Sequence, residues 1–181
     1  MQASRRRKKN LIMGAAVALA FAIAVAYVAS RFWPVAGPEA PRFVATTTDG
    51  EEFVLASHFP FHPVLITFLS VRSTDGQQFL NGTLKDIRTT YAAIELFLLT
   101  IDTNPDGQDT AVFVNAYRAA YDMPWPFAID DGSLRSLYKV ETSIGVFLVG
   151  KRGQITFAAS EPVDFGTIRA TVDASRREYA P

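Results

Sequence analysis

The sequence predicts an α/β domain that follows a single transmembrane helix. Two observations predict the domain: short apolar runs bounded by turn residues, and, between them, segments in which apolar residues recur every three or four positions. Strands and helices alternate in this way in βαβ units. A third observation, a charge-free run near the N-terminus, predicts the membrane helix. The 181 residues allow one such helix and one domain of about 140 residues.

Residues 11–30 contain no charged side chain. At about 1.5 Å per residue, this run spans about 30 Å, the thickness of the hydrocarbon core of a bilayer. The basic residues at positions 5–9 keep the preceding end in the cytoplasm. We therefore expect a cytoplasmic tail over residues 1–10, a helix over residues 11–30 in the cell (inner) membrane, and an extracytoplasmic remainder. A cleaved signal peptide is the alternative because residues 24–26 read Ala-Val-Ala, but the apolar run exceeds the usual ~7–15 residues.

Small residues recur every four positions within the predicted membrane helix, at Gly14, Ala18, Ala22 and Ala26. Such a smooth face lets a neighbouring helix approach closely. The expected partners are therefore the lipid bilayer and integral membrane protein subunits. The alternative is an alanine-rich anchor that packs against no other helix.

Charge and cysteine content exclude several classes of function. The whole chain is neutral, but removal of the five N-terminal cations leaves 13 basic against 18 acidic residues, a net charge of −5 outside the membrane. Nucleic-acid binding needs a basic face, so we expect none. The chain has no cysteine, which excludes disulfides, thiolate nucleophiles, iron–sulfur clusters and cysteine-ligated zinc.

The extracytoplasmic part begins with a proline-rich tether over residues 31–41, which is expected to be extended and to space the domain from the bilayer. The domain is then expected over residues 42–181. It opens with two short apolar runs, 43–45 and 52–55, on either side of Asp49-Gly50. Glycine accepts the positive φ of a tight turn, so these runs predict a β-hairpin.

A buried strand and a helix follow the hairpin. Residues 64–70 are mostly apolar, which predicts a strand covered on both faces. Leu80, Leu84, Ile87 and Tyr91 then recur at helical spacing and should share one side of a helix. A helix N-terminus that follows a central strand lowers the pKa of a thiol placed there. Here that position holds Ser73, for which a helix-capping role is the simplest explanation.

The remaining elements continue the alternation. Residues 96–101 form a buried strand, residues 104–107 a turn, and Asp109 is expected to cap the helix that follows. Residues 125–130 form a short extended segment and residues 133–138 a helical turn or two. Two antiparallel strands are expected at residues 146–149 and 154–158, and Asp164 should cap a final helix with Phe165, Ile168 and Val172 inward.

These motifs resemble the thioredoxin superfamily and, within it, the membrane-anchored SCO/SenC group of copper-handling cytochrome oxidase assembly proteins. In that group a Cys-Pro-x-x-x-Cys-Pro-like loop follows the central strand, and it aligns with residues 72–78 here. Ser73 and Gln77 occupy the two cysteine positions, and Thr142 occupies the position of the histidine ligand. Residues 99–102 and 109–110 resemble the group's "VDP" strand end and "DTP" helix start. The resemblance implies a thioredoxin-like three-layer sandwich with an N-terminal β-hairpin and a degenerate active site.

An alternative alignment uses the TlpA or peroxiredoxin-like redoxins. Their Cys-x-x-Cys motif would fall on residues 73–76 and their cis-proline near Ile144, and neither cysteine nor proline is present there. Both alignments therefore imply an inactive site, with no catalytic residue, no metal and no cofactor.

Other candidate sites have simpler explanations. His58 and His62 lie four residues apart, as metal-binding pairs on helices do, but Pro60 and Pro63 argue against a regular helix. Ser73 as a nucleophile would need a positioned base. A cation site could be imagined from five aspartates that turn and cap roles explain: Asp102, Asp106, Asp109, Asp130 and Asp131.

The aromatic, proline-rich segment at residues 121–127 could form a docking surface or the floor of the core, and burial is the favoured expectation. The sequence as a whole predicts a non-catalytic accessory or assembly subunit of an energy-transducing membrane complex, respiratory or photosynthetic. The alternative is a metal carrier or a non-thiol redox-associated protein that uses His58, His62 or Met123.

Overall fold

The computed structural model describes residues 37–104 and 106–179, which belong to one compact unit, Gly37–Pro181. The predicted membrane helix over residues 11–30 and its small-residue face at Gly14, Ala18, Ala22 and Ala26 lie outside the described residues. Within the described ranges, no helix is both long enough and apolar enough to cross a bilayer.

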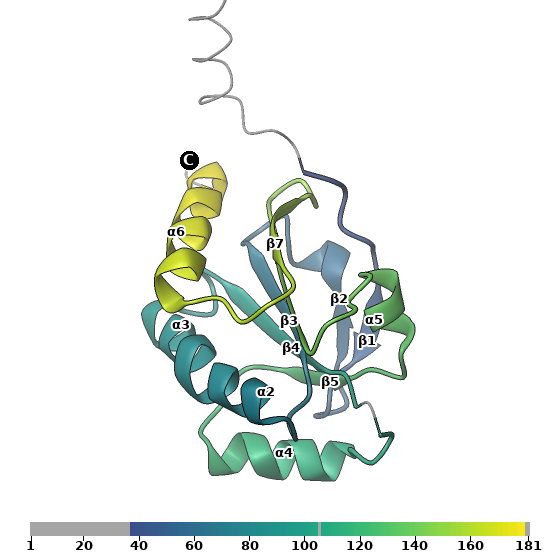
Figure 1. The fold of residues 1–181 in the computed structure, drawn as a ribbon. Helices are drawn as coiled ribbons and strands as arrows, with labels where there is room; N and C mark the ends of the chain where they lie inside the picture. The colour runs from purple at the N-terminus through teal and green to yellow at the C-terminus, as the bar shows by residue number, and fades with distance from the viewer. Residues whose placement is uncertain (1–36, 105, 180–181) are drawn as a thin grey trace, which may run out of the picture. The chain divides into compact units, whose positions relative to one another are not determined.

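A five-stranded mixed sheet forms the centre of the unit, in the order β5-β4-β3-β6-β7 (Figure 1). β3 pairs in parallel with β4, and β4 with β5, whereas β6 runs antiparallel to both β3 and β7. The strands are β3 (Val64–Leu69), β4 (Phe97–Asp102), β5 (Phe127–Ile129), β6 (Ile144–Val149) and β7 (Ile155–Ala159). Each strand predicted from the sequence is present, with ends shifted by one or two residues.

β3 is the middle strand, and all six of its residues are buried. Alternate side chains point to opposite faces of a strand. Ile66 and Phe68 accordingly pack in the core on one side of the sheet, whereas Leu65 and Leu69 pack in the core on the other. The prediction of a strand covered on both faces is confirmed.

One face of the sheet is covered by helices. α2 (Thr74–Phe79), a π-helical turn η2 (Leu80–Leu84) and α3 (Lys85–Thr90) follow one another directly, and α6 (Phe165–Arg176) packs beside α3. The predicted apolar stripe is buried: Leu80, Leu84, Ile87 and Tyr91 are each at most 3% exposed. Asp164 caps α6 as predicted, because its Oδ1 accepts a hydrogen bond from the Thr167 amide.

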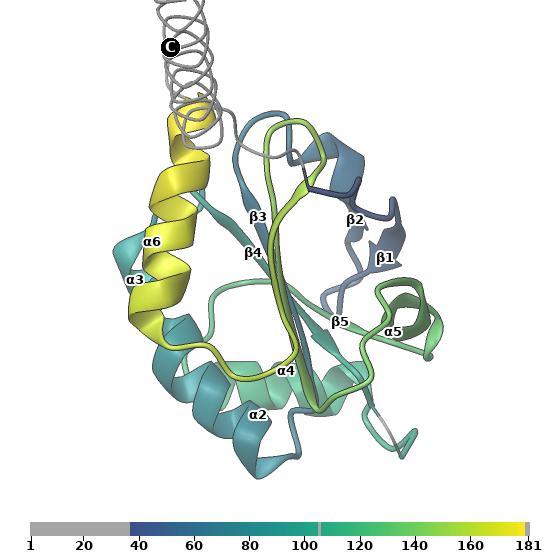
Figure 2. The same cartoon turned by 45° about the horizontal axis from the view of Figure 1, so that its top comes forward.

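The opposite face is covered by a hairpin and a short helix. β1 (Val44–Thr46) and β2 (Glu52–Val54) form the predicted antiparallel hairpin, with Gly50 at a φ of 84° in its turn. The short helices η1 (Leu55–Ser57) and α5 (Ser133–Leu137) complete this layer. Figures 1 and 2 both show β1, β2 and α5 on one side of the sheet and α2, α3 and α6 on the other. The unit is therefore a three-layer sandwich.

The helix after β4 differs from its prediction. α4 (Ala111–Ala120) is capped by Thr110, which accepts the Phe113 amide, rather than by Asp109. Asp109 forms an ion pair with Arg72 instead. Val114 is the fully buried residue of α4, whereas Val112 is 80% exposed. The rest of the described domain therefore leaves much of this helix uncovered.

The predicted tether also differs in its last residues. Pro38 accepts a hydrogen bond from the Ile155 amide at 2.9 Å, and the Ala40 amide donates to Gly153 at 2.7 Å. Glu39 forms a β-bridge with Gln154 between these two bonds, and Ala40 is only 3% exposed. Proline lacks a donor, but its carbonyl still accepts a hydrogen bond. The folded unit thus begins at Gly37, and residues 38–40 belong to the domain rather than to a tether.

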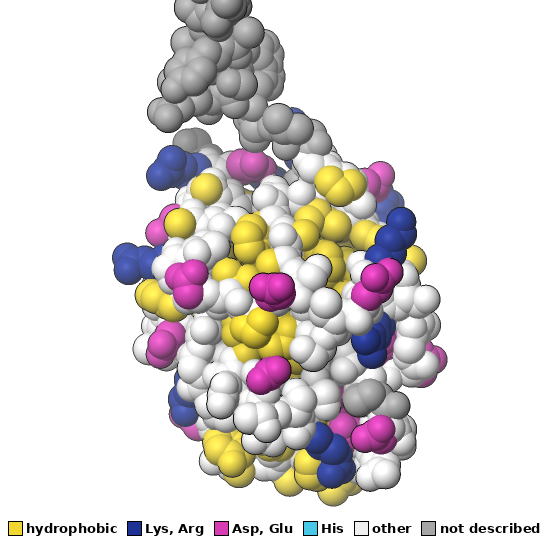
Figure 3. Space-filling model, viewed as in Figure 1, with side chains coloured by type: hydrophobic (Ala, Val, Ile, Leu, Met, Phe, Trp, Pro, Cys, Tyr) yellow, Lys and Arg dark blue, Asp and Glu magenta, His cyan; other side chains and the backbone are white. Residues whose placement is uncertain are grey.

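β7 is an edge strand of the sheet, and its side chains alternate between half-buried and exposed. Ile155 and Phe157 face the interior and are partly buried, and Thr156 faces solvent. Figure 3 shows apolar side chains gathered near the middle of this face of the molecule, with acidic side chains beside them.

Candidate functional site

The loop between β3 and α2 lies where three strands meet. Leu69, the last residue of β3, is in register with Asp102 at the end of β4 and with Ile144 at the start of β6. The loop over residues 70–73 therefore lies at the same end of the sheet as Asp102 and the segment before Ile144. Ser73, Gln77 and Thr142, the three positions that the resemblance aligns with ligands, therefore lie at the same end of the sheet.

Ser73 caps the helix that follows the loop. Its Oγ accepts a hydrogen bond from the Gly76 amide at 3.0 Å and donates one to the Ser70 carbonyl at 2.9 Å. The Gln77 side chain donates from Nε2 to the Val71 carbonyl at 3.0 Å. Both side chains are thus bound to the backbone of the β3–α2 loop. The predicted capping role of Ser73 is confirmed.

Thr142 has a similarly local role. Its hydroxyl donates to the Ile144 carbonyl at 2.8 Å, just before β6 begins. The hydroxyl therefore stabilises the entry of the chain into the strand.

Gly76 makes the tight loop possible. A Cβ at this position would lie 2.2 Å from the Ser70 carbonyl oxygen and 2.7 Å from the Ser73 Oγ. Real Cβ atoms do not come so close to a backbone oxygen, so any larger residue would push the first turn of α2 away from the end of β3.

A buried carboxylate lies beneath the loop. Asp102 is fully buried, and its Oδ1 accepts hydrogen bonds from the amides of Val71 at 3.2 Å and Asn104 at 3.4 Å. Its Oδ2 is buried without a partner among the described residues. Burial raises the pKa of Asp102 to about 7, and the nearby Asp109 carboxylate adds to the rise, whereas the Val71 and Asn104 amides oppose it. Asp102 thus titrates near neutral pH.

Arg72 of the β3–α2 loop binds a second buried carboxylate, Asp109 of the β4–α4 loop. It pairs with Asp109, whose side chain is only 1% exposed, while the Arg72 side chain is 42% exposed. The Arg72 guanidinium also lies 4.0 Å from the centre of the Phe113 ring, at the start of α4. Asn104 holds Asp109 from the other side, because its Oδ1 accepts the Asp109 amide at 2.8 Å. The pair links the β3–α2 loop to the β4–α4 loop.

The sequence did not reveal that Asp102 and Asp109 act together. From the sequence they are assigned separately to turns and caps, whereas the parallel register of β3 and β4 brings the β3–α2 loop, with Val71 and Arg72, against both carboxylates. The position of Asp102 at the end of a buried strand was the available signal. The remaining aspartates keep the expected local roles: Asp130 accepts the Leu134 and Arg135 amides, and Asp131 accepts the Ser133 amide.

The two histidines lie far from this loop. His62 comes just before β3, at the opposite edge of the sheet from Asp102. A hydrogen bond from the His62 amide to the His58 carbonyl, 3.4 Å, makes one turn despite the prolines, and the two ring centres are 5.8 Å apart. Both rings pack on Phe97. Burial lowers the pKa of each, and for His58 the neighbouring His62 lowers it further.

The histidine pair lacks a complete ligand set. Within residues 37–104 and 106–179, no three His, Asp or Glu side chains are grouped so as to hold a metal ion. Met123 does not act as a third ligand for the histidine pair, because it is 2% exposed and packs with Leu80 and Val114 in the core on the helix side of the sheet.

The aromatic segment before β5 is mostly buried. Trp125 is 2% exposed and donates from Nε1 to the Thr100 hydroxyl at 3.0 Å, and Phe127 is fully buried. Tyr121, at the end of α4, remains 45% exposed. The favoured expectation of a core role is confirmed for Met123, Trp125 and Phe127, whereas Tyr121, Asp122 and Pro124 are exposed.

The sequence matches no known protein family model and no curated protein. The structure is nevertheless similar to solved structures. A hypothetical protein from Sinorhizobium meliloti superposes with a TM-score of 0.69 at 23% identity, over 80% of this chain and 85% of that chain. A thiol:disulfide interchange protein of the thioredoxin family from Chlorobium tepidum gives 0.66 at 14% identity, over 77% and 97%.

A thioredoxin-like superfamily protein gives a TM-score of 0.68 at 14% identity, over 80% of this chain and all of that chain. The fold is thioredoxin-like. At such low identities the likeness concerns the backbone arrangement alone.

Proposed function

We propose that this protein is a non-catalytic, membrane-anchored accessory or assembly subunit that acts through contacts. The observation that carries the proposal is a thioredoxin-like fold whose β3–α2 loop holds no thiol. The SCO/SenC resemblance aligns Ser73 and Gln77 with the two cysteines of that group, and both side chains donate hydrogen bonds to nearby backbone carbonyls. Serine needs a positioned base to become a nucleophile, and the only two histidines of the chain lie at the other edge of the sheet.

The finer assignment is to an SCO/SenC-like protein of an energy-transducing complex, respiratory or photosynthetic. It rests on the resemblance of residues 72–78 and 99–102 to the SCO/SenC motifs and on the uncharged run at residues 11–30. The expected place is the cell (inner) membrane, with the N-terminus in the cytoplasm. The partners would be integral membrane subunits that pack against Gly14, Ala18, Ala22 and Ala26.

A metal-carrier role for His58 and His62 is the second candidate. It is favoured by the one-turn geometry of the pair and by the Nε2 of His62, which has no hydrogen-bond partner among the described residues. Titration of the detergent-solubilised full chain with Cu²⁺ or Zn²⁺ separates the two candidates. Stoichiometric uptake that is lost on His62→Phe would favour the carrier, whereas no uptake supports the contact role.

The experiment that tests the main proposal is native purification. The untagged protein would be extracted from membranes in mild detergent, and co-migrating subunits would be identified by mass spectrometry. We expect larger integral membrane subunits to co-purify. Ala18→Leu and Ala22→Leu should weaken this retention, because a bulky side chain separates closely packed helices.

The matched control is Ala20→Leu, which adds the same volume about 200° around the helix from Ala18. Ser73→Ala and Gln77→Ala should leave the co-purifying set unchanged. Loss of the complex on Ser73→Ala or Gln77→Ala, together with retention by Ala18→Leu, would contradict the proposal.

A further inference from the structure

The chain enters the folded unit at one end of the sheet. Gly37 packs so closely on β7 that a Cβ there would lie 1.9 Å from the Ile155 carbonyl oxygen. This contact adjoins the β6–β7 turn. The registers of β6 with β3 and of β3 with β4 place that turn at the same end of the sheet as the beginnings of β3 and β4. We call this end of the domain the entry end. Asp102 and the degenerate loop lie at the opposite end.

The pairing of residues 38–40 with the β6–β7 hairpin shortens the link to the predicted anchor. Only residues 31–36 separate Gly37 from the end of the apolar run at Ser30. Seven residue steps at ~3.3–3.6 Å each reach at most about 25 Å. The headgroup layer on one side of a bilayer takes roughly 5–8 Å of that distance. The remaining ~17–20 Å is an upper limit, so the link is long enough for the entry end to reach the lipid surface.

Basic side chains gather at the entry end. Lys151 and Arg152 lie in the exposed β6–β7 turn, and Arg177 lies just after α6. None of the three forms an ion pair with a described residue, although the Lys151 Nζ donates to the Glu178 carbonyl at 3.1 Å. Arg176 differs, because it is paired with Glu95 and Asp173.

The acidic groups at this end are largely compensated. Glu39 pairs with Arg42 at 3.1 Å, and Glu95 and Asp173 share Arg176. Glu178 is the remaining exposed carboxylate here. Among the described residues of the entry end, the three cations that form no ion pair therefore outnumber the carboxylates that form none, although residues 37–181 carry 12 basic against 18 acidic residues overall.

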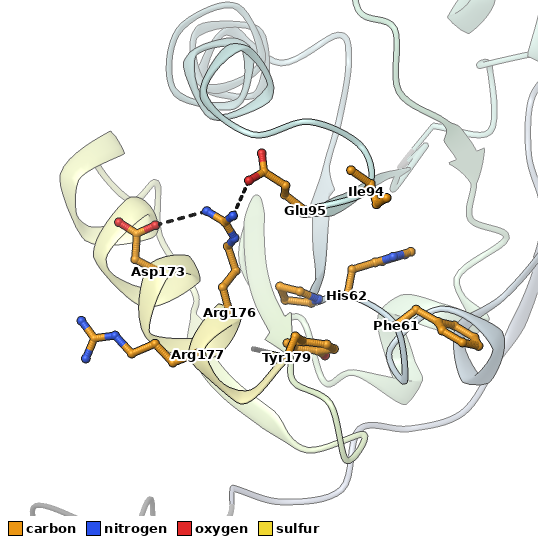
Figure 4. Close-up of a pocket in the computed structure, with 9 residues that line it drawn as sticks. Phe61, His62, Ile94, Glu95, Asp173, Arg176, Arg177 and Tyr179 are labelled. Atoms are coloured by element: carbon orange, nitrogen blue, oxygen red, sulfur yellow. Dashed lines mark hydrogen bonds and ion pairs between the residues drawn. The ribbon is translucent and has the colours of Figure 1, made fainter. Parts of the chain in front are cut away.

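A hollow of about 500 Å³ lies between α6 and the segments that lead into β3 and β4 (Figure 4). Two large apolar side chains stand at its rim with little cover: Phe61 is 74% exposed and Ile94 is 82% exposed. Figure 4 shows the Arg177 side chain directed away from the Arg176–Glu95 pair. Exposed apolar side chains beside free cations match the chemistry of a lipid interface, where apolar groups enter the acyl boundary and cations meet headgroup phosphates.

The opposite end has the reverse charge. Its loops carry exposed carboxylates at Asp75, Asp106, Asp131, Glu141 and Glu161, which outnumber the exposed cation Lys139 beside Glu141. An anionic surface repels this end and attracts the entry end, so both charge groups favour the same orientation.

We propose that the entry end, with Phe61, Ile94, Lys151, Arg152 and Arg177, docks on a bilayer surface that contains anionic phospholipid headgroups. The docked domain holds its degenerate edge away from the membrane. This inference rests on the anchor in the proposed function, since the short link brings the surface within reach.

The absence of native cysteine allows a direct test with single labels on the full chain. Ile94→Cys places a label at the entry end, and Gln78→Cys is the matched exposed control on α2. Each variant carries a nitrobenzoxadiazole label and is reconstituted into phosphatidylcholine vesicles with or without phosphatidylglycerol. Quenching by spin-labelled lipid reports contact with the bilayer, and alkaline carbonate extraction separately reports anchoring.

The proposal expects strong quenching at position 94 and little at position 78 in vesicles with phosphatidylglycerol. Lys151→Glu, Arg152→Glu and Arg177→Glu should each lower the docking equilibrium by at least about fivefold, as expected for a lost cation near an anionic surface. Equal quenching at the two positions, stronger quenching at position 78, or no dependence on phosphatidylglycerol would overturn the docking proposal.

The two proposals fail in different ways. If carbonate does not extract the chain but position 94 is unquenched, the docking surface is wrong and the anchored subunit stands. If carbonate extracts the chain, both proposals are wrong.

Discussion

The buried carboxyl group of Asp102 gives the sharpest prediction, through the substitution Asp102→Asn. Burial raises its pKa to about 7 from the ordinary value of 3.8. The folded protein therefore holds this proton between about pH 4 and pH 7, whereas the unfolded chain releases it. The contribution of Asp102 to the free energy of unfolding therefore falls as pH rises through that range, because this group binds more protons in the folded state there. Asparagine carries no such charge and still offers an oxygen to the Val71 amide.

The magnitude follows from the shift. Each pKa unit corresponds to about 1.4 kcal/mol, so the three units from 3.8 to about 7 allow at most about 4 kcal/mol. At pH 7 the folded carboxyl group is only half deprotonated, so about 1.7 of these units act between pH 5 and pH 7. We therefore expect the variant to gain about 2 kcal/mol relative to the wild type over that interval, and less than about 0.5 kcal/mol more above pH 7.

The assay is urea unfolding of residues 37–181, followed by far-UV circular dichroism at pH 5, 6, 7 and 8 for both proteins. The comparison uses the difference between variant and wild type, so the histidine titrations cancel. Asp164→Asn is the control. Hydrogen bonds from Thr167 hold the pKa of this exposed capping carboxylate below its usual value, so the difference in free energy of unfolding between this variant and the wild type should not change between pH 5 and pH 8. A flat or falling difference for Asp102→Asn would refute the assignment of a proton to this carboxyl group at neutral pH.

Three further predictions concern the loop and the histidines. Gly76→Ala should lower the free energy of unfolding by about 1–3 kcal/mol, because its Cβ would meet the Ser70 carbonyl oxygen. Ser73→Ala should cost about 1 kcal/mol through loss of the helix cap, measured by urea unfolding. His58→Phe should remove a contribution to stability that rises between pH 5 and pH 7, so the free energy of unfolding of the variant should fall more steeply with pH than that of the wild type, because burial lowers the pKa of His58 and the unfolded chain then binds more protons.

These predictions have matched controls. Gly82→Ala meets nothing within 4 Å of the new Cβ, and it should be neutral or stabilising by up to about 1 kcal/mol. Equal effects at Gly76 and Gly82 would argue against the close approach at Ser70. Thr74→Ala leaves the cap intact, so a loss as large as that of Ser73→Ala would contradict the capping role. For His58→Phe, an unchanged slope against pH would be the contrary result.

Local patterns of apolar and turn residues predicted much of the fold. β3 was predicted from the apolar run at residues 64–69, and the helix that covers it from the apolar stripe between Leu80 and Tyr91. Such predictions succeed because the buried side of a regular strand or helix requires apolar residues at a fixed spacing. The hairpin turn at Gly50 was also predicted, since few residues accept its φ of 84°. Caps were predicted less well: Asp109 and Thr110 both suit the start of a helix, and only the ion pair with Arg72 decides between them.

The sequence by itself determined the absence of thiol chemistry, since a chain without cysteine cannot supply it whatever its fold. It also determined the alternation of strands and helices that makes the fold α/β, because the spacing of apolar residues within each element can be read from that element's own sequence.

Only the tertiary structure decided what surrounds the degenerate loop and where the domain begins. The parallel register of β3 and β4 buries Asp102 beneath that loop, and the β6–β7 hairpin takes residues 38–40 into the domain. Both outcomes depend on pairing between segments far apart in the chain. Burial and the pKa it shifts are properties of that assembled environment, which no local pattern of residues records.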